Sequence, residues 1–363
     1  MPHHFVRTRL ASLLMLIALV LLAVPLHRQP VVSGQTPPTL TPLELAHIAE
    51  IRHVLTTYAA DVWSGWEDNL PPLLFRKGDF DYLIGHPDPP AEFEPVPDLQ
   101  LDGEAVWRMA GHVTPAPVAT AWPVGEVWAA TTPVRDEFQA AVDELLGEGV
   151  VVLDDVAFIR AVVHEAFHAY QMNHYGGPEH LPEFTYTSDL TWLDTLTDEQ
   201  RLALDTGLVA EGQALNEALS DEATEAEIHA ALGEFLRLRT ERRANLPDEA
   251  TAFEWAVEWT EGAARYSDTR LMLLAGSLDY VPSHEATAVN LTYPSSDDVW
   301  EDFRAQLGDI LSIPGGYRDR FYVLGAAQLF ILDRLTDDWQ SRLWEEGAAV
   351  EDLLADYLTE ENP

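Results

Sequence analysis

Two histidines, with a glutamate directly after the first, lie in the middle of a predicted helix. The segment reads His-Glu-Ala-Phe-His at residues 164–168. Apolar residues recur around it at helical spacing, and Asp154 or Asp155 is placed to cap the start of the helix. In an α-helix, positions i and i+4 share one face, with Cβ atoms about 5–6 Å apart. Both imidazole rings can therefore reach one metal ion.

The available donor atoms narrow the choice of metal. The chain has no cysteine, so a bound ion must be held by histidine and carboxylate. Zn²⁺ accepts such ligands and keeps a fourth position for water in catalytic sites. Glu165 follows the first histidine and can act on that water as a general base. The pattern predicts a Zn²⁺ site with His164 and His168 as ligands and Glu165 as a catalytic residue.

The segment from Glu258 to Tyr266 is the best source of a third ligand, because an E-G-x-A phrase begins there at Glu261. Together with the His-Glu-x-x-His motif, it resembles the gluzincin metallopeptidases, in which a glutamate on a later helix completes the site. The back half as a whole is similar to exported bacterial proteins that carry this motif. The resemblance implies that Glu261 is the third ligand. Glu258 could then orient a histidine, and Arg265 could neutralise either carboxylate.

Glu211 begins the same phrase and is an alternative third ligand. It lies closer to His168 along the chain, within a long predicted helix that bears other acids. A structural role is the competing interpretation there. Glu261 is preferred because its helix concentrates three glutamates and Arg265 on one stripe.

A donor to the developing oxyanion would complete a peptidase site. Tyr322 is the preferred candidate, because Gly325 shortly after it permits the close approach of another helix. Tyr266 and His174 are alternatives. Each of the three could equally be a packed aromatic side chain or a surface histidine.

The first 34 residues differ from the rest of the chain. Arg7 and Arg9 precede an apolar run over residues 10–26, followed by prolines and small residues. This pattern is typical of a signal peptide, with residues 32–34 as a cleavage site, or of a membrane anchor. We expect an exported protein, either secreted or anchored on the outer face of the cell membrane. Any membrane association would come only through this segment.

The charge balance excludes one class of partner. The chain carries 61 Asp and Glu against 21 Lys and Arg, a net charge of −40. Such an acidic chain repels nucleic acid, so DNA or RNA binding is not expected. The expected partner is a peptide or protein substrate.

Periodicity and capping signals divide the chain into a mixed front half and a helical back half. Thr197 and Thr224 each begin a capping-box pattern. We expect helices over about 42–63, 135–146, 154–174, 249–266, 297–311 and 318–335, with others starting near 198 and 225 and a short one at the end of the chain. Strands are expected within 104–113, 118–132 and 150–153, and a loop over 86–97.

These observations predict a mainly helical α+β protein, zincin-like, with a small N-terminal mixed sheet. The expected parts are a signal peptide or anchor at 1–34, an α/β part at 35–150 and a helical part with the zinc site at 151–363. The expected function is hydrolysis of amide bonds by zinc-activated water. The alternatives are an exported binding or interaction module with a structural zinc, a degenerate peptidase site, a structural helical protein in which the motif is accidental, and a zinc hydrolase of other substrates.

Overall fold

The computed structural model describes residues 37–101, 103–175, 190–313 and 316–360. They form two compact units. The first lies within Met1–Gly176 and Arg270–Ser296, and the second within Gly177–Thr269 and Asp297–Pro363. The expected signal peptide or anchor at residues 1–34 lies outside the described residues. Among the described residues, no helix is both long enough and apolar enough to cross a membrane.

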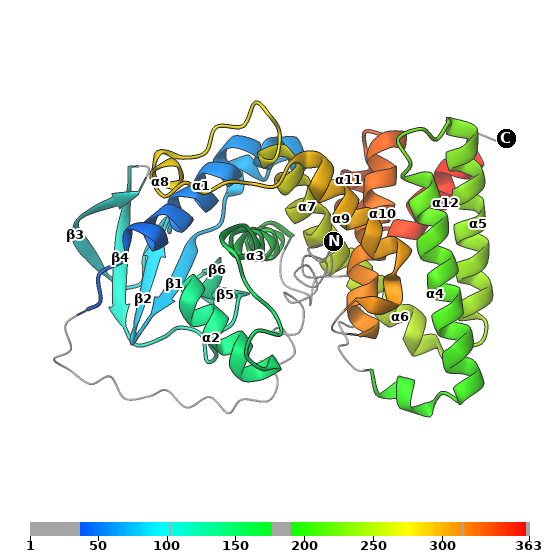
Figure 1. The fold of residues 1–363 in the computed structure, drawn as a ribbon, viewed down its shortest axis with the longest axis horizontal. Coiled ribbons are helices and arrows are strands. Elements are labelled where there is room, and N and C mark those ends of the chain that lie inside the picture. The colour runs from blue at the N-terminus through cyan, green and yellow to red at the C-terminus, as the bar shows by residue number, and fades with distance from the viewer. Residues whose placement is uncertain (1–36, 102, 176–189, 314–315, 361–363) are drawn as a thin grey trace. The chain divides into compact units, whose positions relative to one another are not determined.

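The first unit contains one mixed sheet of six strands (Figure 1). The strands are β1 (Leu73–Lys77), β2 (Phe80–Ile84), β3 (Glu94–Leu101), β4 (Glu104–Ala110), β5 (Thr120–Val124) and β6 (Val127–Pro133). Their order across the sheet is β3-β4-β2-β1-β6-β5. Only β1 and β6 pair in parallel; the other neighbours are antiparallel. The predicted small mixed sheet in a mainly helical α+β protein is confirmed.

Glycines make two tight hairpin turns in this sheet possible. Gly78 connects β1 to β2 with a φ of 55°, and Gly125 connects β5 to β6 with a φ of 64°. Two-residue hairpin turns need a positive φ, which glycine adopts without steric cost. One face of the sheet then buries a compact apolar cluster. Its fully buried members are Leu74, Leu83, Phe93, Val124 and Ala129.

Helix α3 (Asp155–Tyr175) carries the histidine motif and packs against β5, β6 and α1 (Pro42–Val62). Phe167 of α3 contacts two tryptophans that follow α1. Its ring centroid lies 4.9 Å from that of Trp63 and 5.1 Å from that of Trp66. All three side chains are at most 1% exposed. This aromatic contact fixes the rotation of α3 relative to α1.

The cap of α3 and the remaining helices of the first unit follow local sequence signals. Asp154 Oδ1 accepts a hydrogen bond from the Ala157 backbone N–H at 2.8 Å, so Asp154 is the residue that caps α3. The other helices are α2 (Arg135–Leu146), which ends at Gly147 as predicted, and the short α8 (His284–Ala288).

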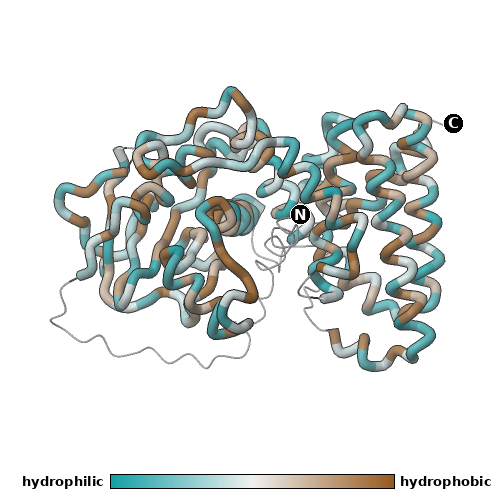
Figure 2. Tube along the Cα trace, viewed as in Figure 1, coloured by the Kyte–Doolittle hydropathy of each residue, from teal (hydrophilic) through white to brown (hydrophobic). Residues whose placement is uncertain are grey.

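The described residues of the second unit form helices and their connections (Figure 1). They are α4 (Asp198–Ala218), α5 (Glu225–Arg243), α6 (Asp248–Val257), the π-helical turn η7 (Glu258–Gly262), α9 (Ser296–Gly308), α10 (Tyr317–Leu335), α11 (Trp339–Glu345) and α12 (Val350–Glu360). Helix α7 (Ala263–Ala275) begins in this unit, and its residues from Arg270 onward belong to the first. Complete capping boxes begin α4 at Thr197 and α5 at Thr224, as predicted. Hydrophilic and hydrophobic residues recur in turn along α4 and α5, as expected for helices with one buried face (Figure 2).

Three local expectations differ from the structure. Residues 150–153 do not form a strand, because the side chain of Gln139 bonds the backbone of Val151 and Leu153 instead of a neighbouring strand. Strand β3 begins at Glu94, inside the expected loop at 86–97, and its prolines are tolerated at the edge of the sheet. The boundary expected near residue 150 lies inside the first unit, because α3 packs on the sheet.

Candidate metal centre

The two motif histidines face one another from successive turns of α3. Their Nε2 atoms are 3.2 Å apart, and the ring planes meet at 84°. Two nitrogens bound to one tetrahedral Zn²⁺, each at about 2.0–2.1 Å, would be separated by about 3.3 Å. His164 is buried and His168 half-buried. The spacing of the Nε2 atoms therefore fits two ligands of a single zinc ion.

Gln171 fixes the orientation of the second histidine. Its Oε1 lies 2.7 Å from Nδ1 of His168, and its side chain is buried. An amide oxygen accepts hydrogen bonds, so Nδ1 carries the proton and Nε2 keeps the lone pair that a metal needs. Gln171 is not part of the sequence motif. The available signal was its position three residues after His168, which places the two side chains side by side on a helix.

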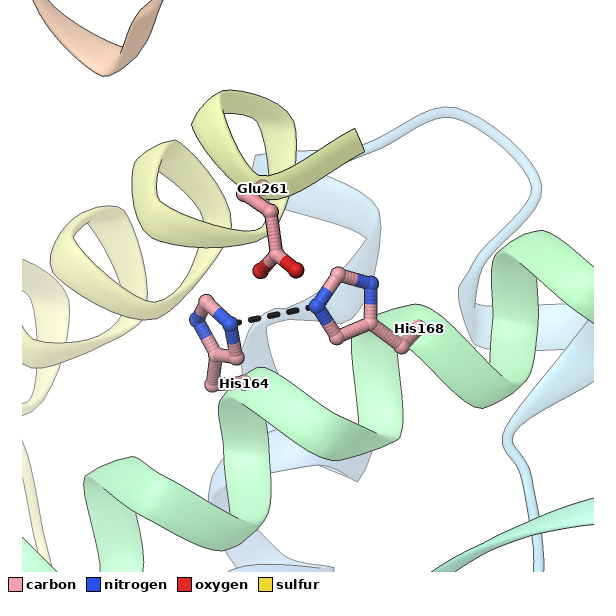
Figure 3. A group of neighbouring side chains, drawn as sticks. All are labelled: His164, His168 and Glu261. Carbon is pink, nitrogen blue, oxygen red and sulfur yellow. Dashed lines mark hydrogen bonds between the residues drawn. The ribbon is translucent and has the colours of Figure 1, made fainter. Parts of the chain in front are cut away.

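Glu261 and the two histidines form a group of side chains that could hold a metal ion. His164, His168 and Glu261 each offer one ligand atom, and these atoms lie within 4.8 Å of one another (Figure 3). The carboxylate points toward both imidazole rings in Figure 3. Glu261 is itself buried, at 6% exposed. Two imidazole nitrogens and one carboxylate oxygen are the donor set typical of a catalytic zinc ion.

Glu261 lies in η7, a single π-helical turn between α6 and α7. Such turns are rare and occur frequently at functional sites. The turn is pressed against α10 through two glycines. A Cβ added to Gly262 would lie 2.8 Å from Cα of Gly325, so neither position has room for a side chain. The predicted close approach of a helix at Gly325 is confirmed.

Arg318 of α10 forms an ion pair with Glu261. Its Nη2 donates to Oε1 of Glu261 at 2.7 Å, and Arg318 is 2% exposed. Arg265 had been expected to neutralise this carboxylate or that of Glu258. Its guanidinium contacts Asp268 at 3.4 Å and Gln306 at 3.1 Å. A cation on Glu261 thus comes from α10, a segment that helical spacing alone could not identify.

Asp319 follows Arg318 in the chain and has a shifted pKa. Burial raises its pKa to about 8; the positive charge of Arg318 opposes this rise and the negative charge of Glu261 adds to it. Asp319 is 1% exposed, and its Oδ2 has no hydrogen-bond partner among the described residues. This carboxyl is thus largely protonated at neutral pH.

Glu258 does not have the role expected from its spacing. Both of its oxygens accept hydrogen bonds from Arg239 of α5, at 2.8 Å from Nη1 and 2.6 Å from Nη2. The pair is almost fully buried. Glu258 therefore ties the first residue of η7 to α5, rather than orienting a histidine.

Glu211, the alternative ligand, belongs to the same buried network. Its oxygens accept from Nε of Arg239 at 3.0 Å and from Nε and Nη2 of Arg242 at 2.5 and 3.2 Å. Glu211 is 0% exposed. Its carboxylate is neutralised by two guanidinium groups, which gives it a structural role. Among the described residues, the glutamate grouped with the two histidines is Glu261.

The network as a whole joins four carboxylates to three arginines. Its members are Glu211 of α4; Arg239, Arg242 and Arg243 of α5; Glu254 of α6; Glu258 of η7; and Glu351 of α12. Two further groups donate to it: the Tyr317 hydroxyl to Glu254 at 2.5 Å, and the Trp255 indole N–H to Glu351 at 2.8 Å.

The arginines control the ionisation of this network. Burial alone would raise the pKa of Glu254, but Arg242 and Arg243 lower it to about 2. Glu351 behaves alike: burial opposes its charge, yet Arg239 and Arg243 lower its pKa to about 2. At Glu258 burial prevails and raises the pKa despite the Arg239 charge.

The catalytic candidates are placed as follows. Glu165 lies on α3 between the two histidines and is 8% exposed. Tyr322 lies on α10 and is 1% exposed, with the Arg318 guanidinium carbon 5.5 Å from its ring centroid. The hydroxyl of Tyr266 donates to Asp333. His174 is exposed and stacks on Tyr170 at 5.3 Å.

Comparison of the chain with protein-family models, with curated proteins and with solved structures finds no match. The interpretation of the site therefore depends on the chemistry and geometry of its own residues.

Proposed function

We propose that this chain is a zinc-dependent hydrolase, a gluzincin-like peptidase on a zincin-like scaffold. The observation that carries the proposal is the cluster of His164, His168 and Glu261 with Glu165 next to the first histidine. No thiolate is available, and Nε2 of both histidines can bind a metal. Three protein ligands are the number typical of catalytic zinc, which keeps one position for water, whereas structural sites are closed by four.

Each residue around the proposed ion has a separate role in amide hydrolysis. Bound zinc would polarise the substrate carbonyl and lower the pKa of a water molecule to about 7. Glu165 accepts the proton of the attacking water and delivers it to the leaving amine nitrogen. Gln171 keeps His168 in the tautomer that binds metal through Nε2. Tyr322 is the proposed hydrogen-bond donor to the developing oxyanion.

The proposed substrate is a peptide or protein in an extended conformation. Strand β5 forms one edge of the sheet and packs against α3, the helix that bears the histidines. Its outer edge can add a substrate strand through backbone hydrogen bonds. Pro123 of β5 contributes no N–H, so acceptor groups dominate at that point of the strand. In this proposal the protein acts outside the cell, secreted or held by its N-terminal segment.

The test separates metal binding from catalysis. Purified protein is expected to contain about one zinc per chain, and the double variant His164→Ala/His168→Ala none, by elemental analysis. Glu165→Gln is expected to keep the zinc and to lose hydrolysis of a peptide library, because the amide cannot accept the proton. Glu199→Gln, an exposed change on α4, is the matched control and should retain both properties. Full zinc content without any peptide cleavage by the wild type would instead favour a binding module.

A further inference from the structure

The ion pair between Arg318 and Glu261 does more than neutralise a buried carboxylate. Arg318 occupies Oε1, one of the two oxygens through which Glu261 could coordinate an ion. A carboxylate with both oxygens available can bind a metal through either one or both of them. A guanidinium bound at Oε1 disfavours coordination of a metal through both oxygens of Glu261. Fewer protein donor atoms leave more of the coordination sphere to water and substrate.

The guanidinium is also well fixed. Arg318 lies two residues into α10, is 2% exposed, and has its charge 5.5 Å from the centre of the Tyr322 ring, within cation–π range. The contact between Gly262 and Gly325 holds η7 against the same helix. Both partners of the ion pair are therefore set on elements that pack directly on one another.

We infer that Arg318 is a positioning residue that restricts Glu261 to one-oxygen coordination and weakens the hold of the site on its metal. The inference rests on the proposed function. A fixed positive charge next to a ligand oxygen repels a dication, because Coulomb interactions inside a protein are screened less than in water. Arg318 thus lowers metal affinity, and in return keeps the coordination sphere open for the reaction.

Cobalt binding to the full chain tests this inference, since the visible absorption of Co²⁺ is stronger in four-coordinate than in five-coordinate sites. The wild type is expected to give the strong bands of a four-coordinate ion. Arg318→Met should give weaker, five-coordinate bands. Because it removes a positive charge beside the ion, it should also bind Co²⁺ and Zn²⁺ at least about tenfold more tightly in chelator competition. Arg318→Lys, which keeps a charged donor, should restore the wild-type spectrum.

Two further variants complete the test. Arg320→Met removes another arginine of α10, which pairs with Asp205 at 2.8 Å, and should leave spectrum and affinity unchanged. Should Arg318→Met fail to fold, Arg318→Gln keeps a neutral donor and should bind metal more tightly with the wild-type spectrum. Weaker metal binding by Arg318→Gln, or a wild-type spectrum for folded Arg318→Met, would overturn the role inferred for Arg318 and leave the proposed function standing. A wild type that binds neither ion would overturn the proposed function itself.

Discussion

Gly262 and Gly325 bring the backbones of η7 and α10 into direct contact: a Cβ on Gly325 would lie 2.9 Å from Cα of Gly262 and 3.0 Å from Cα of Glu258. Neither neighbour is a flexible side chain that could move aside. The approach therefore depends on both residues being glycine, and it determines where the π-helical turn places Glu261.

The first prediction follows from this contact. Gly325→Ala is expected to destabilise the fold by about 1–3 kcal/mol, as overpacking of a core does, and to weaken zinc binding because η7 must shift. The control is Gly233→Ala on α5, where an added Cβ meets nothing within 4 Å. That change should stabilise the protein by up to about 1 kcal/mol. Urea unfolding and chelator competition measure the two effects; unchanged zinc affinity in Gly325→Ala would contradict the role of the contact.

The second prediction separates the two glutamates that share a sequence phrase. Glu261→Ala should lose zinc, because only two protein ligands remain. Glu211→Ala should keep zinc in the folded protein but lose about 3–5 kcal/mol of stability, since it leaves two buried guanidinium groups short of a partner. Zinc content and denaturant unfolding of both variants decide the matter. Loss of the metal in folded Glu211→Ala, with retention in Glu261→Ala, would reverse the assignment.

The third prediction concerns Gln171. Gln171→Met has similar length but no acceptor for the Nδ1 proton of His168, so zinc affinity should fall by about 10–100-fold. His174→Ala, an exposed change on the same helix, is the control and should not alter it. Zinc dissociation constants from chelator competition give the comparison. Equal constants for the two variants would show that Gln171 does not orient the ligand.

The fourth prediction is a pH dependence of stability. Glu254 and Glu351 have pKa values of about 2 in the fold, against an ordinary value of 4.5. A depressed pKa contributes stability that is present above pH 4.5 and lost as the pH falls toward 2. The pKa of Glu258 is raised, so its ionisation lowers the stability of the fold as the pH rises.

Urea unfolding at about pH 7 and pH 3 measures this contribution. Glu351→Gln should be less stable than the wild type at pH 7. The difference should shrink at pH 3, because the carboxyl of the unfolded wild type is protonated there, whereas the folded protein, with a pKa of about 2 at Glu351, still holds it ionised. Glu345→Gln, an exposed change on α11, is the control and should follow the wild type at both values. A difference for Glu351→Gln that does not change with pH would contradict the ionisation assigned to the network.

Local signals predicted much of the fold. The caps at Thr197, Thr224 and Asp154 lie within three residues of the groups they bond, so the sequence alone identifies these helix starts. The spacing of His164 and His168 on one helical face is equally local. Such features depend on neighbouring residues and need no knowledge of tertiary packing.

The features that could not be predicted depend on distant residues. Glu211 and Glu261 begin the same phrase, and what separates them is the arginines that reach them: Arg239 and Arg242 at the first, Arg318 at the second. The expected role of Glu258 was wrong for the same reason, because helical spacing says nothing about Arg239 on another helix. The π-helical turn left no signal in the apolar periodicity.

The ion pairs between α12 and the buried network affect what happens when the chain is shortened at its C-terminal end. Glu351 of α12 bonds Arg239, and Arg239 in turn holds Glu258 at the start of η7. Proteolytic removal of residues 350–360 would spare every proposed metal ligand, yet it would take one anion away from Arg239 and Arg243. Removal of α12 is therefore expected to affect η7, the turn that carries Glu261, through the ion pairs Glu351–Arg239 and Arg239–Glu258.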